Sequence, residues 1–197
     1  MGTRNLTVVY VDGNPVIAQY GQWDGYPMGQ GKEALEFCRK HLRTKAGREK
    51  FREKLSLCRW DRPGEVDSAL QEIGVTNGMM NMDQVRKFDC LFPHMSRDIG
   101  AGILRRVAVA TSEVVLQDNT SFSLDSLFCE FAYVVDLTQK TLEAYVGFQN
   151  TPHVGERFSS PIPNGGGYYP VKLAGSWDLG KLPALSTFNR KIMGSKG

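Results

Sequence analysis

The sequence has few cysteines and histidines and no long apolar run, and each of these absences excludes a class of protein. Its four cysteines and three histidines are scattered through 197 residues, and no two cysteines lie two or four positions apart. Zinc sites use such close pairs, so we expect no metal site, no other cofactor and no disulfide framework. No stretch reaches the roughly 18 consecutive apolar residues of a membrane-spanning helix, which predicts a protein with no membrane span.

The amino terminus also lacks the order of a secretion signal. It reads MGTRNLTVVYVDG, with one arginine before a short apolar run and then an Asp-Gly turn, whereas a signal peptide has a charged, an apolar and a small-residue region in that order. We therefore interpret the protein as cytoplasmic. Hydrophobic residues at 41% and charged residues at 23% are ordinary globular values, and the chain is long enough to form a single domain over residues 1–197.

Positive and negative charges nearly balance over the sequence, and a clear excess of one sign occurs in a single basic segment. The net charge is +3, yet the segment Lys32–Arg62 holds eleven basic residues against five acidic ones. The signs alternate along what reads as amphipathic helices, a pattern typical of a solvated helix face. No nucleic-acid-binding motif accompanies the segment, so we expect no specific nucleic-acid partner and only weak binding that falls steeply with salt.

What is present is a pattern of strands at both ends of the chain. Apolar and β-branched runs at Leu6–Val11 and Val16–Tyr20 flank a short Asp-Gly-Asn turn, which predicts a hairpin. A second hairpin is predicted from Phe128–Val135 and Thr141–Val146, followed by a last strand over Tyr168–Trp177.

Helical spacing of apolar residues occupies the middle of the chain and its end. The expected helices are two from Lys32 onward with a break at Ala46-Gly47, one at Asp67–Ile73, one at Met82–Phe88, one after Ser96 and one at Leu185–Met193. Strands at both ends with helices grouped between them indicate an α+β fold, in which antiparallel hairpins pack with a central group of helices.

Two glycine-rich loops are the strongest candidates for a binding site. The first, Gly21–Gly31, reads GQWDGYPMGQG and should be ordered, because its aromatic and proline residues are wasteful in a flexible linker. The second, Thr151–Gly167, would border the same pocket if the first and last strands were neighbours. The candidate ligand-binding residues are Arg4, Gln22, Trp23, Tyr26, Asn164 and Tyr169.

Asp24 is predicted to be the most function-sensitive carboxylate in the chain. Its neighbours Trp23 and Gly25-Tyr26-Pro27 should restrict water around it while the backbone turns toward it. Three roles are open: accepting hydrogen bonds from the loop's own N–H groups, pairing with Arg4 or Arg97, or orienting a ligand.

The segments GTRNL and QYGQWDGYPMGQG resemble an uncharacterised protein family of fungi and bacteriophage-like genomes. Members of that family open Met-Gly-Thr-Arg and carry a Gln-aromatic-Asp-Gly-Tyr-Pro loop. The later segments SRDIGAGIL, DSLFCEFAYVVDL and YYPVKL are similar to further blocks of the family, so the resemblance covers most of the chain. The resemblance implies a shared fold and indicates no mechanism.

Gly2-Thr3 and the hairpin that follows resemble, more weakly, the N-terminal nucleophile hydrolases. This resemblance implies a layered sandwich fold and an amide hydrolase in which Thr3, freed of Met1-Gly2, is the nucleophile and Asp24 assists it. Thr3 would then need a free α-amine to act as the base for its own hydroxyl. Two function classes stay open on the sequence: a module that binds a small molecule or a protein partner around Gly21–Gly31, and this hydrolase.

Overall fold

The centre of the protein is a five-stranded mixed sheet. The computed structural model describes residues 2–76 and 78–195. The strands run in the order β2-β1-β5-β6-β7, in which β1 and β5 are parallel and every other neighbouring pair is antiparallel. Their bounds are Asn5–Val11 for β1, Asn14–Gly21 for β2, Phe131–Asp136 for β5, Thr141–Val146 for β6 and Lys172–Asp178 for β7.

The two central strands are buried on both faces, because apolar side chains alternate along them. In β1, Val9 packs into one apolar cluster while Val8 and Tyr10 pack into a second cluster on the other face. All six residues of β5 are buried. The sheet therefore separates two cores, and the larger one lies beneath the helices.

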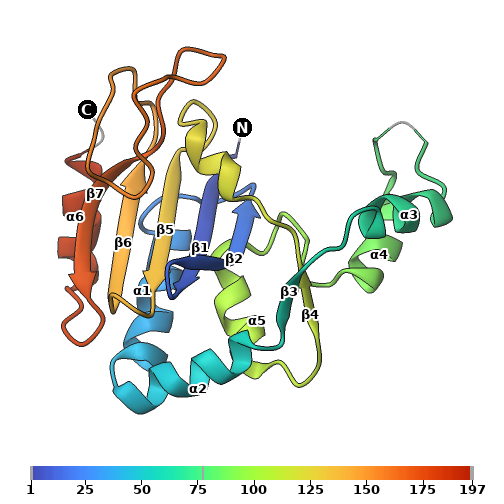
Figure 1. Ribbon diagram of the computed structural model, residues 1–197, viewed down its shortest axis with the longest axis horizontal. Coiled ribbons are helices and arrows are strands. Elements are labelled where there is room, and N and C mark those ends of the chain that lie inside the picture. The colour runs from blue at the N-terminus through green and yellow to red at the C-terminus, as the bar shows by residue number, and fades with distance from the viewer. Residues whose placement is uncertain (1, 77, 196–197) are drawn as a thin grey trace.

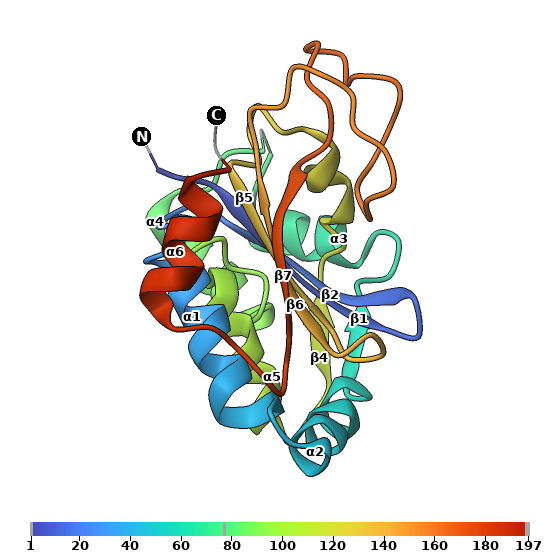
Figure 2. The same ribbon diagram turned by 90° about the vertical axis from the view of Figure 1, so that its left-hand side faces the viewer.

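Helices α1, α5 and α6 cover one face of the sheet (Figure 2). The other face is covered by a 3-10 turn at Thr120–Leu124 and by the segment between β6 and β7, which contributes Phe158 and Val171 to the smaller core. The helices are α1 Gln30–Phe37, α2 Lys45–Leu55, α3 Glu65–Glu72, α4 Met82–Leu91, α5 Ile103–Val109 and α6 Leu185–Met193, with a π turn at Cys38–Leu42 and a 3-10 turn at Gly100–Gly102.

Helices α3 and α4 stand apart from the layers around the sheet. They form an extension to one side of the molecule, which the chain enters after β3 (Cys58–Trp60) and leaves after α4 (Figure 1). Strand β3 pairs in parallel with β4 (Val114–Leu116), which follows α5 in the chain. Helix α4 has no buried residue, and α3 buries only Ala69. The sequence pattern predicts both helices but not that they form an extension.

The expected α+β class is confirmed, and both predicted hairpins are present. The hairpins join edge to edge through the parallel β1–β5 pair. The described residues form one five-stranded sheet and a separate two-stranded ribbon, so the layered sandwich of the hydrolase resemblance is not supported. Within 2–76 and 78–195, no helix combines the length and the apolar character needed to cross a membrane.

Candidate functional site

The Gly21–Gly31 loop is fixed by its own backbone. Gly25 N–H donates to the carbonyl of Thr3 at 2.9 Å, and Gln30 N–H donates to the carbonyl of Asp24 at 2.8 Å. The hydroxyl of Tyr133, a fully buried residue of β5, donates to the carbonyl of Gly25 at 2.7 Å. A side chain at position 25 would meet the Thr3 carbonyl at 2.8 Å, so only glycine allows this approach. The loop is ordered, as its composition predicts, and it packs against the start of β1.

This fixed backbone holds three large apolar side chains in solvent. Trp23 is 47% exposed, Tyr26 is 49% exposed and Met28 is 52% exposed. Trp23 is held by a hydrogen bond from its indole Nε1 to the Asp98 carboxylate at 2.9 Å, and the Tyr26 ring lies 5.9 Å from the ring of Phe131. Exposed apolar groups on an ordered backbone are typical of contact surfaces.

Two hollows lie near the loop, and only one of them is lined by loop residues. One, of about 560 Å³, is bordered by the loop and by α6, and its lining residues are Asp24, Tyr26, Pro27, Met28, Gly29, Asn189 and Met193. The other, of about 600 Å³, lies between the α4 region and the segment that holds Trp23 through Asp98. Its lining residues are Gly78, Met79, Met80, Met82, Val85, Phe88, Asp89, Met95, Ser96, Arg97 and Asp98.

The surroundings of Asp24 differ from those expected. We predicted a position shielded from water, but the side chain is exposed and forms no ion pair or hydrogen bond in the described part of the chain. Pairing with Arg4 or Arg97 is therefore not observed. Asp24 instead has a left-handed backbone, with φ of 54°, and its carbonyl rather than its carboxylate closes the loop onto Gln30.

Thr3, the candidate nucleophile, is only 6% exposed. Its carbonyl accepts the hydrogen bond that ties down Gly25, and a side chain at Gly2 would collide with the Trp23 ring at 2.4 Å. Arg4 stacks on the ring of Phe128, with its guanidinium carbon 4.7 Å from the ring centre. These contacts build the base of the loop.

Gln22 is likewise engaged within the protein. Its side-chain oxygen accepts a hydrogen bond from the Tyr20 hydroxyl at 2.5 Å, and its backbone N–H donates to the carbonyl of Arg97 at 2.9 Å. Trp23 and Tyr26 are therefore the predicted ligand-binding residues of this loop that the structure leaves most exposed.

The second loop does not join the first. Asn164 and Tyr169 precede β7, whereas Gly21–Gly31 follows β2, and strands β1, β5 and β6 separate these two edge strands. The expectation that both loops border one pocket required neighbouring first and last strands, and that condition is not met. Asn164 uses its side-chain oxygen to accept hydrogen bonds from Gly166 and Tyr168 N–H groups at 3.0 Å, so it stabilises its own loop.

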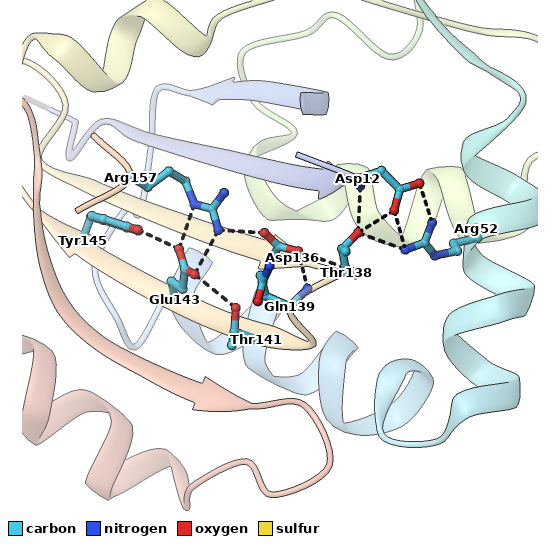
Figure 3. Close-up of polar contacts among 9 residues, drawn as sticks. All are labelled: Asp12, Arg52, Asp136, Thr138, Gln139, Thr141, Glu143, Tyr145 and Arg157. Carbon is cyan, nitrogen blue, oxygen red and sulfur yellow. Dashed lines mark hydrogen bonds and ion pairs between the residues drawn. The ribbon is translucent and has the colours of Figure 1, made fainter. Parts of the chain in front are cut away.

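A charged network that the sequence analysis missed lies on the other face of the sheet (Figure 3). Arg157 contacts the Asp136 carboxylate at 2.8 Å and the Glu143 carboxylate at 3.0 Å, and its guanidinium lies 4.3 Å from the ring centre of Tyr10. The Tyr145 hydroxyl donates to Glu143 at 2.6 Å. Burial, followed by the charge of Glu143, raises the pKa of Tyr145.

This network borders a hollow of about 430 Å³, yet its carboxylates are occupied. One Asp136 oxygen accepts from the N–H groups of Thr138 and Gln139 and the other from Arg157. Both oxygens of Glu143 also accept hydrogen bonds. Because the acceptors are satisfied internally, we interpret the network as an anchor for the segment that carries Arg157.

The positions of the side chains that commonly bind metals give no candidate metal site among the described residues. Among residues 2–76 and 78–195, no three His, Cys, Asp or Glu side chains are grouped so that they could hold a metal ion. Cys38 and Cys129 are fully buried, where free cysteine behaves as a small apolar side chain, and burial raises the pKa of both thiols. Neither thiol is placed to react with a solvent-borne substrate.

Comparison with protein-family models, with curated proteins and with solved structures gives no significant match to this chain. The two resemblances described above therefore stay predictions.

Proposed function

We propose that the protein is a binding module that presents the Gly21–Gly31 loop to an apolar segment of a protein partner. One observation supports this most directly. A loop tied down through Thr3, Asp24 and Tyr133 keeps Trp23, Tyr26 and Met28 about half exposed. Such a surface loses little conformational freedom on binding, because its backbone is already ordered before the partner arrives.

The residue types on this surface suit protein recognition. Tryptophan and tyrosine are enriched among the residues that dominate binding energy at interfaces, and methionine adapts its shape to a partner. Met79 and Met82 in the neighbouring hollow are 82% and 70% exposed. A small molecule is usually enclosed by one pocket, whereas here Trp23, Tyr26 and Met28 are exposed on the loop itself, which favours a peptide or protein segment.

A peptide-display experiment tests this proposal. Peptides selected on the parent protein should carry apolar anchor residues and should bind Met28→Lys/Met193→Lys at least tenfold more weakly, because two charges then border the α6 hollow. Both side chains are exposed, so folding should be unaffected. Val109→Lys/Ile162→Lys is the matched control, since it places two lysines at exposed apolar positions elsewhere. Equal binding of the selected peptides to both double variants would exclude this surface.

The hydrolase alternative has no observation in its favour. A nucleophilic Thr3 would need a free α-amine and access for substrate, whereas the residue is almost completely covered and Gly2 packs against Trp23. We therefore assign Thr3 a structural role in closing the loop. Intact-mass measurement of the purified protein is a direct check, since a chain that begins at Thr3 would restore the hydrolase hypothesis.

A further inference from the structure

A basic hollow of about 250 Å³ lies between one face of α2 and the tip of the β5–β6 hairpin. Four cationic side chains border it, Lys45, Arg48, Arg52 and Lys140, with Glu49 as the single carboxylate in the lining. The hairpin tip follows Asp136, which pairs with Tyr10 near the carboxyl end of β1. The Gly21–Gly31 loop instead starts at the amino end of β1, where Gly21 pairs with Asn5. The hollow is thus at the opposite end of the sheet from the proposed partner surface.

Both arginines are held in place by contacts within the protein. Arg52 donates to the Thr138 hydroxyl at 3.1 Å and pairs with Asp12 at 3.3 Å (Figure 3). Arg48 donates through Nη1 to the carbonyls of Leu42 and Arg43 at 2.8 Å and 3.0 Å. A guanidinium has five N–H donors, so each arginine keeps further donors while its orientation is already fixed.

The charges around the hollow do not cancel. Glu49 pairs with Lys45 at 3.7 Å, but both side chains are more than half exposed and such a pair is weak. Asp12 offsets Arg52. Arg48 and Lys140 have no carboxylate partner within the described residues, so the hollow keeps an excess of positive charge that only an external anion can balance.

We infer that this hollow binds a phosphate group, carried either by a small soluble molecule or by a lipid headgroup. Fixed guanidinium groups match the oxygens of a phosphate in pairs, and lysine ammonium groups add point charges around them. The volume equals roughly eight water molecules at about 30 Å³ each, which suits a phosphate group with a small substituent. The inference does not depend on the partner surface at the other end of the sheet.

Calorimetric titration with inorganic pyrophosphate tests the site. The variant Lys45→Gln/Lys140→Gln should bind at least tenfold more weakly than the parent, because it removes the two lysines and leaves both structural arginines in place. The matched control is Lys32→Gln/Lys172→Gln. Lys32 pairs with Glu36 four residues along a helix, as Lys45 does with Glu49, and the net charge changes equally. The control should bind like the parent.

Vesicles distinguish a free phosphate from a lipid headgroup as the source of the ligand. Sedimentation with phosphatidylcholine vesicles, with and without phosphatidic acid, is measured for the same three proteins. Binding to the phosphatidic acid vesicles alone, lost in Lys45→Gln/Lys140→Gln, would support the site and assign a headgroup. Two results would overturn the inference: no binding of either probe by the parent, or equal weakening in both double variants, which would mean that only net charge matters.

Discussion

Asp24 is the residue whose surroundings depart most from expectation, and its backbone rather than its charge explains its place in the loop. A left-handed φ of 54° is tolerated best by glycine, asparagine and aspartate, since their side chains avoid or offset the clash with the backbone. Its carboxylate is exposed and unpaired in the described chain. The backbone of Asp24 therefore adopts the left-handed conformation that the turn requires, and its carboxylate stays available to a partner.

Substitution at Asp24 separates the backbone role from a charge role. We expect Asp24→Asn to change the free energy of unfolding by no more than about 0.5 kcal/mol, because asparagine also accepts the left-handed region. Asp24→Val should cost about 1 to 2 kcal/mol, since a β-branched side chain is strained there. Urea denaturation monitored by tryptophan fluorescence measures both. A loss of several kcal/mol in Asp24→Asn would instead indicate a buried charge pair.

At the scale of elements, the segment between β6 and β7 is attached to the sheet by two adjacent side chains. Arg157 reaches the carboxylates of Asp136 and Glu143, and Phe158 packs edge-on against Tyr145 with ring centres 4.9 Å apart. The side chains of Asp136 and Glu143 are 3% and 12% exposed. A polar anchor and an apolar anchor thus hold a long glycine-rich and proline-rich loop on one face.

Removing the polar anchor should destabilise the protein strongly. Arg157→Met leaves two largely buried carboxylates without their counter-ion, so we expect a loss of about 3 kcal/mol in the free energy of unfolding. Arg157→Lys keeps the charge but not the forked geometry of the guanidinium, so its free energy of unfolding should fall by less. The comparison is made by chemical denaturation at neutral pH. If Arg157→Met were as stable as the parent, the network would be a surface feature rather than an anchor.

The regular elements were predictable where local pattern decides them. The strand Thr141–Val146 and the helix Leu185–Met193 have the expected bounds. The last strand starts later than predicted, at Lys172, because Pro170 has no N–H to pair. The helix expected after Ser96 begins at Ile103, since a 3-10 turn with Gly100 at φ of 50° precedes it.

The candidate site was predictable only in part. The composition of the Gly21–Gly31 loop predicted a candidate site there, whereas no sequence pattern predicted the Arg157 network. Asp136 and Glu143 come together because their strands pair in one register, in which Asp136 lies opposite Thr141 and Glu143 opposite Val134, and Arg157 arrives from a loop. Side chains that meet through strand pairing and a returning loop leave no spacing signal in a single sequence.

The whole molecule has a layered body and an extension, and the two should differ in stability. Helix α4 buries no residue and α3 buries one, whereas every residue of β5 is buried. Local opening requires less free energy where fewer apolar contacts must be broken. The hollow beside α4 is thus formed partly by the less stable part of the protein.

Amide hydrogen exchange tests this difference. We expect the protected amides of α3 and α4 to exchange at least about 100-fold faster than those of β5, because the extension opens without unfolding the sheet. Helix α6, which buries Phe188 and Ile192 against the sheet, is the internal control and should exchange as slowly as the body. Uniform exchange across α3, α4 and β5 would show that the protein opens only as a single cooperative unit.

The parallel β1–β5 pair has a consequence for how the chain is made. The hydrogen bond from Arg4 N–H to Glu130 at this junction spans 126 positions, so β1 waits for a partner that is synthesised much later. At about 5 to 20 residues per second, the wait is about 6 to 25 s on the ribosome. During that time one edge of an apolar strand is unpaired, and closing so long a loop slows folding. Strand β1 is therefore completed late, and the sheet can close only after β5, β6 and β7 have been translated.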